Sequence, residues 1–273
     1  MSVRRLGYVI EALHAPAYFA PEVREAYAGL GLRGFWRGYF AGRASAVALN
    51  EPAADAARIT ELFGGFAPRM VARAIPEVWT ITTPEAAYEA RRDGAGAAIT
   101  RLAAKQLPRT QLVLADLAHR VEPHLGTAPM AAAEAARPVP EDRGAAVWHW
   151  ATILRELRGD LHLAAVRAAG VGWPQMHVLV APTGRLDPRQ REYRGWTEDE
   201  WAAAEAELTD AGLYRTEAGA ALIERIEVET DQRMTEVLGK AAVLSATGFL
   251  RAAAVLTVAD VPFPNAMGLP PLD

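Results

Sequence analysis

The chain has 273 residues, of which 51% are hydrophobic and 23% charged, and its formal net charge is −4. This composition supplies enough apolar surface for a sizeable core and excludes a disordered polypeptide. The absence of cysteine excludes disulfides, a thiolate nucleophile, zinc ribbons and iron–sulfur clusters. We find no window of about 18 apolar residues and no signal-type stretch in residues 1–20, so a cytoplasmic protein without membrane contact is expected.

Apolar residues recur at helical spacing along most of the chain, which predicts a mainly α-helical fold. A Pro/Ala-rich stretch, 123–140, is predicted to be a linker. Gly159 is expected to end one helix and Asp160 to cap the next. The predicted helices are 6–19, 21–29, 33–44, 53–63, 68–75, 84–104, 109–121, 142–157, 160–169, 174–181, 188–193, 198–211, 217–238 and 241–256.

The parts on either side of the linker resemble each other. In each, a Gly-aromatic segment opens a helix, Gly34-Phe35 in the first and Gly172-Trp173 in the second. Farther on, Thr83 and Thr216 each stand before a long helix with an acid in its first turn, as expected for N-caps. The repeat predicts an internal duplication, with one half at 1–122 and the other at 141–273.

The second half resembles a winged-helix domain of the MarR type in the segments Trp196–Trp201, Leu208–Leu213 and Thr216–Gly219. The whole chain also resembles an actinobacterial helix-turn-helix family. That likeness is carried by the segments His14–Glu22, Gly38–Arg43, Phe66–Ala74 and Arg158–His162. These resemblances imply two tandem, degenerate winged-helix halves that pack through their long C-terminal helices as an intramolecular pseudo-dimer. They also imply a ligand cleft between the halves.

The charge pattern argues against specific DNA binding, because neutralising phosphates supplies most of the affinity of a winged helix. The candidate recognition helix, 198–211, contains six acidic residues and no Arg or Lys. Only Leu213, Tyr214 and Arg215 separate it from the Thr216 cap, which is too short for a wing. The formal charge is −7 from Glu141 onward and +3 before it.

Two clusters of aromatic, His and Arg residues are the candidate ligand site. Such stripes are commonly helix-packing core, but Arg among aromatic rings also suits a planar anion. We expect the clusters to face each other across a cavity, with Arg43 or Arg158 holding a ligand carboxylate. Arg69 is a further candidate, against the alternative of a solvated salt bridge. The clusters are His14, Tyr18, Trp36, Tyr39 and Arg43 in the first half and Trp148, Arg158, His162 and Trp173 in the second.

Motifs for metal and cofactor chemistry are not found. The six histidines include no pair at three- or four-residue spacing, and phosphate loops and a GxSxG elbow are missing. No metal and no cofactor are therefore predicted. The sequence favours a monomer or homodimer that senses or sequesters an aromatic or amphipathic organic molecule, anionic ones included. The alternatives are a MarR-like transcriptional regulator and an acid–base or positional enzyme, of secondary metabolism for example, with His14 and His162 as candidate catalytic residues.

Overall fold

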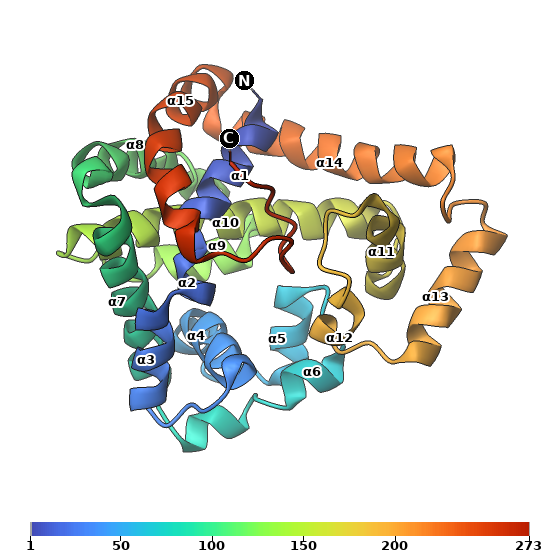
Figure 1. The fold of residues 1–273 in the computed structure, drawn as a ribbon, viewed down its shortest axis with the longest axis horizontal. Helices are drawn as coiled ribbons and strands as arrows, with labels where there is room; N and C mark the ends of the chain where they lie inside the picture. Colours follow the sequence, from blue (N-terminus) through green and yellow to red (C-terminus); the bar gives the residue numbers. More distant parts are fainter. Residues whose placement is uncertain (1, 273) are drawn as a thin grey trace.

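The computed structural model describes residues 2–272 and consists of α-helices joined by 3-10 turns and loops, with no strand in that range (Figure 1). The mainly helical fold expected from the sequence is thereby confirmed. The helices before residue 123 are α1 (Val3–His14), α2 (Pro16–Phe19), α3 (Pro21–Gly29), α4 (Phe35–Asn50), α5 (Ala56–Phe63), α6 (Pro68–Ala72), α7 (Pro84–Ala103) and α8 (Leu107–His119). They are followed by α9 (Pro129–Ala135), α10 (Arg143–Ala168), α11 (Trp173–Val180), α12 (Gln190–Arg194), α13 (Glu198–Asp210), α14 (Glu217–Leu238) and α15 (Lys240–Thr257).

The two threonines expected to cap long helices do so. The hydroxyl of Thr83 accepts a hydrogen bond from the Ala86 N–H, and that of Thr216 accepts one from the Gly219 N–H, each at 3.2 Å. Each bond satisfies an N–H that the first helical turn cannot pair internally. The bounds of α14 are those predicted from the sequence.

The predicted helix break at Gly159 is wrong, because α10 runs without interruption from Arg143 to Ala168. Asp160 caps a different helix. Its Oδ2 accepts hydrogen bonds from the N–H groups of Met130 and Ala131, each at 3.0 Å, in the first turn of α9. The stretch 123–140 therefore contains a helix whose N-terminus is anchored on α10, and Met130 and Ala131 are buried.

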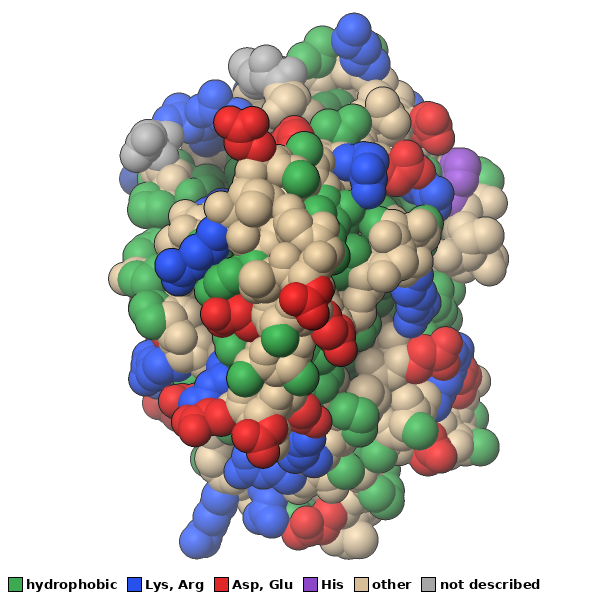
Figure 2. Space-filling view, turned by 90° about the vertical axis from the view of Figure 1, so that its right-hand side faces the viewer, with side chains coloured by type: hydrophobic (Ala, Val, Ile, Leu, Met, Phe, Trp, Pro, Cys, Tyr) green, Lys and Arg blue, Asp and Glu red, His purple; other side chains and the backbone are tan. Residues whose placement is uncertain are grey.

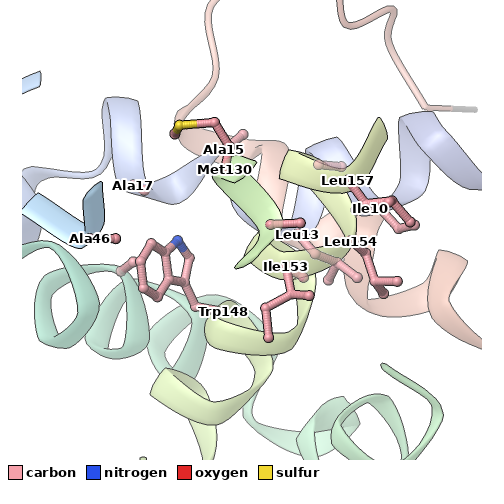
Figure 3. Packing of buried hydrophobic residues seen from close by; sticks show 14 of the residues in the cluster. Ile10, Leu13, Ala15, Ala17, Ala46, Met130, Trp148, Ile153, Leu154 and Leu157 are labelled. Carbon is pink, nitrogen blue, oxygen red and sulfur yellow. The ribbon is translucent and has the colours of Figure 1, made fainter. Parts of the chain in front are cut away.

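The main core forms where α7 and α10 cross at small residues. A Cβ on Gly96 would lie 2.6 Å from the backbone nitrogen of Ala145, so only glycine allows this approach. Trp148 of α10 is fully buried and points between Ala17 and Ala46, while α1 and α10 pack through apolar side chains such as Leu13 and Leu154 (Figure 3).

Buried apolar residues form two clusters. The larger combines α1–α9, the first part of α10, the C-terminal end of α14 and the whole of α15. The smaller surrounds α11 and α13 and includes Val166 from the end of α10 and Ile226 from α14. The two long helices α10 and α14, which run across the molecule in Figure 1, therefore contribute to both clusters.

One segment, Lys240–Asp260, has a mean hydropathy of 1.7 over an 18-residue window, so the expectation that no such window exists is wrong. By length and composition it could cross a membrane, but the core helix of a soluble protein has the same composition. In this structure α15 packs against α1 and α8 and buries Val243, Leu250 and Ala254.

Candidate functional site

A cavity of about 920 Å³ lies where the larger and smaller apolar clusters meet. Its volume falls within the range of small-molecule sites. Helices α1, α2 and α4 and the turn between α5 and α6 supply one side. Helices α10, α11 and α12, Glu227 of α14 and the segment 262–268 supply the other, so the cavity is lined from both predicted halves.

Aromatic rings form a continuous part of this lining. The ring centroid of Tyr39 lies 5.6 Å from those of both Tyr18 and Trp36, and Trp36 lies 6.3 Å from Tyr193. Phe66, in the turn after α5, lies 5.8 Å from Tyr39. Offset and edge-on rings at these distances attract one another and give a rigid apolar surface.

Seven of the ten side chains predicted for the site line the cavity: Tyr18, Trp36, Tyr39, Arg43, Arg158, His162 and Trp173. Three do not. His14 and Trp148 are fully buried behind the lining, with their ring centroids 5.8 Å apart. Arg69 is exposed outside the cavity, where it donates to the Gly195 carbonyl and forms an ion pair with Glu200 of α13.

His14 touches the cavity only through Tyr18. The hydroxyl of Thr152 donates to the Trp148 carbonyl, so it accepts from Nδ1–H of His14 at 2.9 Å. Nε2 of His14 is then the unprotonated nitrogen, and it accepts from the Tyr18 hydroxyl at 2.9 Å. Burial, together with the charges of Arg91 and Arg155, lowers the pKa of His14 well below its ordinary value. The imidazole is therefore neutral and orients the Tyr18 proton away from the cavity.

Arg43 already has a carboxylate partner. Its guanidinium donates to both oxygens of Glu156, at 3.1 and 3.4 Å, and Arg155 donates to the same carboxylate at 2.9 Å. Burial raises the pKa of Glu156, but the charges of Arg155 and Arg43 outweigh it and hold that pKa well below its usual range. Arg43 is thus committed to an internal ion pair, which leaves little capacity for a ligand carboxylate.

Arg158, the other predicted carboxylate holder, is committed in the same way. It donates to Glu227 of α14 at 2.7 Å. Its side chain crosses α1 at Gly7, where a Cβ would lie 2.9 Å from the Arg158 Nε. Glycine at this position lets the guanidinium reach across α1 to α14.

Sequence reasoning missed Arg194, at the end of α12, and the loop 262–268. Arg194 lies over the Phe66 ring at 4.5 Å, and its Nη2 donates to the Ala266 carbonyl at 3.1 Å. Asn265 orders the loop by accepting the N–H groups of Met267 and Leu269. No periodic pattern marks these residues, and only the sequence Tyr193-Arg194 resembles the Arg-aromatic pattern used to find the first cluster.

The remaining polar groups do not form a nucleophile–base pair. His162 contacts Thr230 through Nδ1 at 3.4 Å, and burial lowers its pKa. Nε2 of His177 donates to the Gly65 carbonyl at 2.9 Å. In the part of the chain that the structure describes, no three His, Asp or Glu side chains are grouped to hold a metal ion.

The arrangement of helices defines the class of protein. Helix α11 packs against α13, with the short α12 in the connection, and α13 begins with a capping box between Thr197 and Glu200. This is a helical protein with a cavity beside a candidate helix-turn-helix. Residues 3–261 match a helix-turn-helix family, so the chain belongs to that family. No curated protein and no solved structure matches the chain.

Proposed function

We propose that the protein binds a small, partly aromatic organic molecule in the cavity between its two halves, for sensing or sequestration. The cavity itself carries the proposal. Its volume of about 920 Å³ is in the range of ligand sites, and its continuous aromatic lining, set among polar groups that hydrogen bonds hold in place, suits an aromatic molecule.

The packing of the helices supports a duplicated, pseudo-dimeric architecture. The first helix of the first half, α1, packs against the last helix of the second, α15. The first helix of the second half, α10, packs in turn against α8, the last long helix of the first, and α8 and α15 contact each other. Helices of each half thus pack against helices of the other half. This is expected if the halves correspond to two MarR-like protomers, whose ligand sites lie near their interface.

The second candidate function is transcriptional regulation, which membership of a helix-turn-helix family favours. The charge of α13 opposes it. Glu198, Asp199, Glu207 and Asp210 are exposed on this helix, and Figure 2, which views the side where α13 lies, shows acidic side chains gathered over the middle of that face. A helix with this charge would be repelled by DNA phosphates.

A cavity-filling variant tests ligand binding. The only atom within 4 Å of a Cβ built on Gly159, which lines the cavity from α10, is Glu156 Oε2 at 3.7 Å. Gly159→Phe should therefore place a ring in the cavity, and Gly159→Ala is the matched control. We expect native mass spectrometry to find an organic molecule bound to the wild type and to Gly159→Ala but not to Gly159→Phe.

If nothing co-purifies, an organic fragment library should raise the melting temperature of the wild type more than that of Gly159→Phe. No co-purified molecule and no such difference would refute the proposal. Selection of a consensus duplex from random DNA, with affinity that falls steeply as salt rises, would favour the regulator instead.

A further inference from the structure

The arginines that line the cavity differ in whether the protein neutralises them. Arg43, Arg155 and Arg158 each pair with at least one carboxylate. Arg189 pairs with Asp187. Arg185 and Arg194 form no ion pair with a carboxylate in residues 2–272, but Arg185 is exposed to water whereas Arg194 is partly buried. An arginine inside a protein without a counterion is costly, so its charge calls for an anion from elsewhere.

The hydrogen bonds of Arg194 leave most of its donors free. Of its five N–H groups, one on Nη2 donates to the Ala266 carbonyl, and Nε is buried without a partner. Nη1 lies near Gly65 in the turn after α5, 3.8 Å from where a Cβ of that glycine would be. Burial, with the charges of Arg43 and Arg155 nearby, lowers the pKa of Arg194. The guanidinium group of Arg194 thus has unsatisfied donors and lies at the cavity.

Two tyrosines of the cavity lining, Tyr18 and Tyr39, offer opposite hydrogen-bonding groups to a ligand. Tyr39 accepts from Nη1 of Arg43 at 3.3 Å, which leaves its own proton available to a ligand. The Tyr18 hydroxyl donates its hydrogen bond to His14, so only the oxygen lone pairs of Tyr18 remain for a ligand. Tyr39 can therefore donate, whereas Tyr18 can only accept.

Glu11 provides a second hydrogen-bond acceptor in addition to Tyr18. Oε2 of Glu11 accepts from Arg155 at 3.2 Å, but Oε1 is buried without a partner. Glu11 lines the cavity one helical turn before His14, which holds Tyr18. The cavity lining therefore offers donors at Arg194 and Tyr39 and acceptors at Tyr18 and Glu11, with the Tyr39 and Tyr18 rings 5.6 Å apart.

We propose that the cavity selects an aromatic carboxylic acid that also carries a hydroxyl group. Its carboxylate binds Arg194 and Tyr39, its hydroxyl donates to Tyr18 or Glu11, and its ring packs on Trp36 and Tyr39. This assignment rests on the proposed function, since it names the class of ligand for the same cavity.

A matched series of fluorescent probes on one bicyclic ring tests it: 6-hydroxy-2-naphthoate, 2-naphthoate and 2-naphthol, titrated into the full-length protein. We expect the affinity to fall in that order. Loss of the carboxylate should cost about tenfold or more, as expected for a hydrogen bond to a charged group. If all three bind equally, the assignment is wrong but the proposed function stands. If none of them binds, the assignment is likewise wrong, and the proposed function is then decided by the mass-spectrometry and fragment-library test described above.

Single substitutions test each proposed contact between the ligand and the protein. Arg194→Met should weaken both carboxylates by about tenfold or more and leave 2-naphthol unchanged, which also shows that the variant is folded. Tyr18→Phe should make the two carboxylates bind equally if Tyr18 accepts the ligand hydroxyl, and Glu11→Gln should do so if Glu11 accepts it. A hydroxyl advantage that survives both substitutions overturns this contact. Arg191→Met is the matched control, because Arg191 lies in the same short helix but pairs with Glu198 away from the cavity.

If Arg194→Met loses 2-naphthol as well, Arg194→Lys, which keeps the charge, decides the question. Restored preference for the carboxylates over 2-naphthol supports the anion site. Equal weakening of all three probes by Arg194→Met and Arg194→Lys overturns it, as does an unchanged preference in Arg194→Met.

Discussion

Replacing Glu156 by Gln should destabilise the protein more than removing either arginine that it neutralises. Glu156 is 1% exposed and Arg43 is 5% exposed. Glu156→Gln leaves the Arg43 charge buried without a counterion, since Arg155 retains Glu11 but Arg43 has no second carboxylate among the described residues. Breaking a buried pair in this way typically costs about 3–5 kcal/mol of unfolding free energy.

Arg43→Met should cost less, about 1.5–3 kcal/mol, because Glu156 then remains paired with Arg155. Arg120→Met is the control. Arg120 pairs with Asp116 on the exposed face of α8, where ion pairs contribute about 0–1 kcal/mol. Urea denaturation of the three variants at pH 7 measures the order.

The pH dependence provides an independent check. The folded-state pKa of Glu156 lies below its unfolded value, so the stability it contributes is complete above the unfolded pKa and is lost as pH falls toward the folded one. The wild type should therefore lose its advantage over Glu156→Gln only in strong acid. Equal stability of Glu156→Gln and Arg43→Met at pH 7 would refute the reasoning.

Three further changes probe other features. Gly159→Ala should stabilise the protein by about 0.5–1 kcal/mol, because it removes a mid-helix glycine without a steric conflict; a loss of stability would show that α10 needs the glycine. Gly96→Ala should destabilise by about 1–3 kcal/mol at the α7–α10 crossing, while Gly126→Ala, in open space, should change little; similar denaturation midpoints would contradict the close approach. Burial and nearby Arg194 lower the pKa of His177 to about 3, so the unfolded chain binds a proton between about pH 6.5 and 3 that the folded one does not. As pH falls through this range, the unfolding free energy should decrease less steeply in His177→Gln than in the wild type, by up to about 1.4 kcal/mol per pH unit, and equal slopes would contradict a neutral His177 in the folded protein.

Local signals in the sequence predicted the elements well where a local interaction determines them. Thr83 and Thr216 cap the helices that follow them, as expected. Gly159 and Asp160 misled because the partners of Asp160, two amides of α9, lie about 30 residues away and leave no local trace. The sequence Gly159-Asp160 therefore predicts the end of one helix and the start of another, although packing keeps α10 continuous there.

The same limit applies to the cavity. The composition of α4 located its aromatic lining, and seven predicted side chains are there. Which arginine is free could not be predicted, because the partners of Arg43 and Arg158 come from elements about 113 and 69 residues away. Arg194 stands out only once the partners of the other cavity arginines are known and the unpaired Arg185 is seen to be exposed.

The spread of the cavity lining along the chain has a consequence for biosynthesis. Gly7 and Gly268 lie at opposite ends of the sequence, yet both border the same space, and Asn265 holds the last segment in place. On the ribosome, the aromatic residues of α4 emerge long before the loop that closes the cavity. A nascent chain therefore lacks the last segment of the cavity lining until more than 200 further residues have been synthesised. The ligand recognition that we propose for this cavity accordingly requires segments from both ends of the sequence.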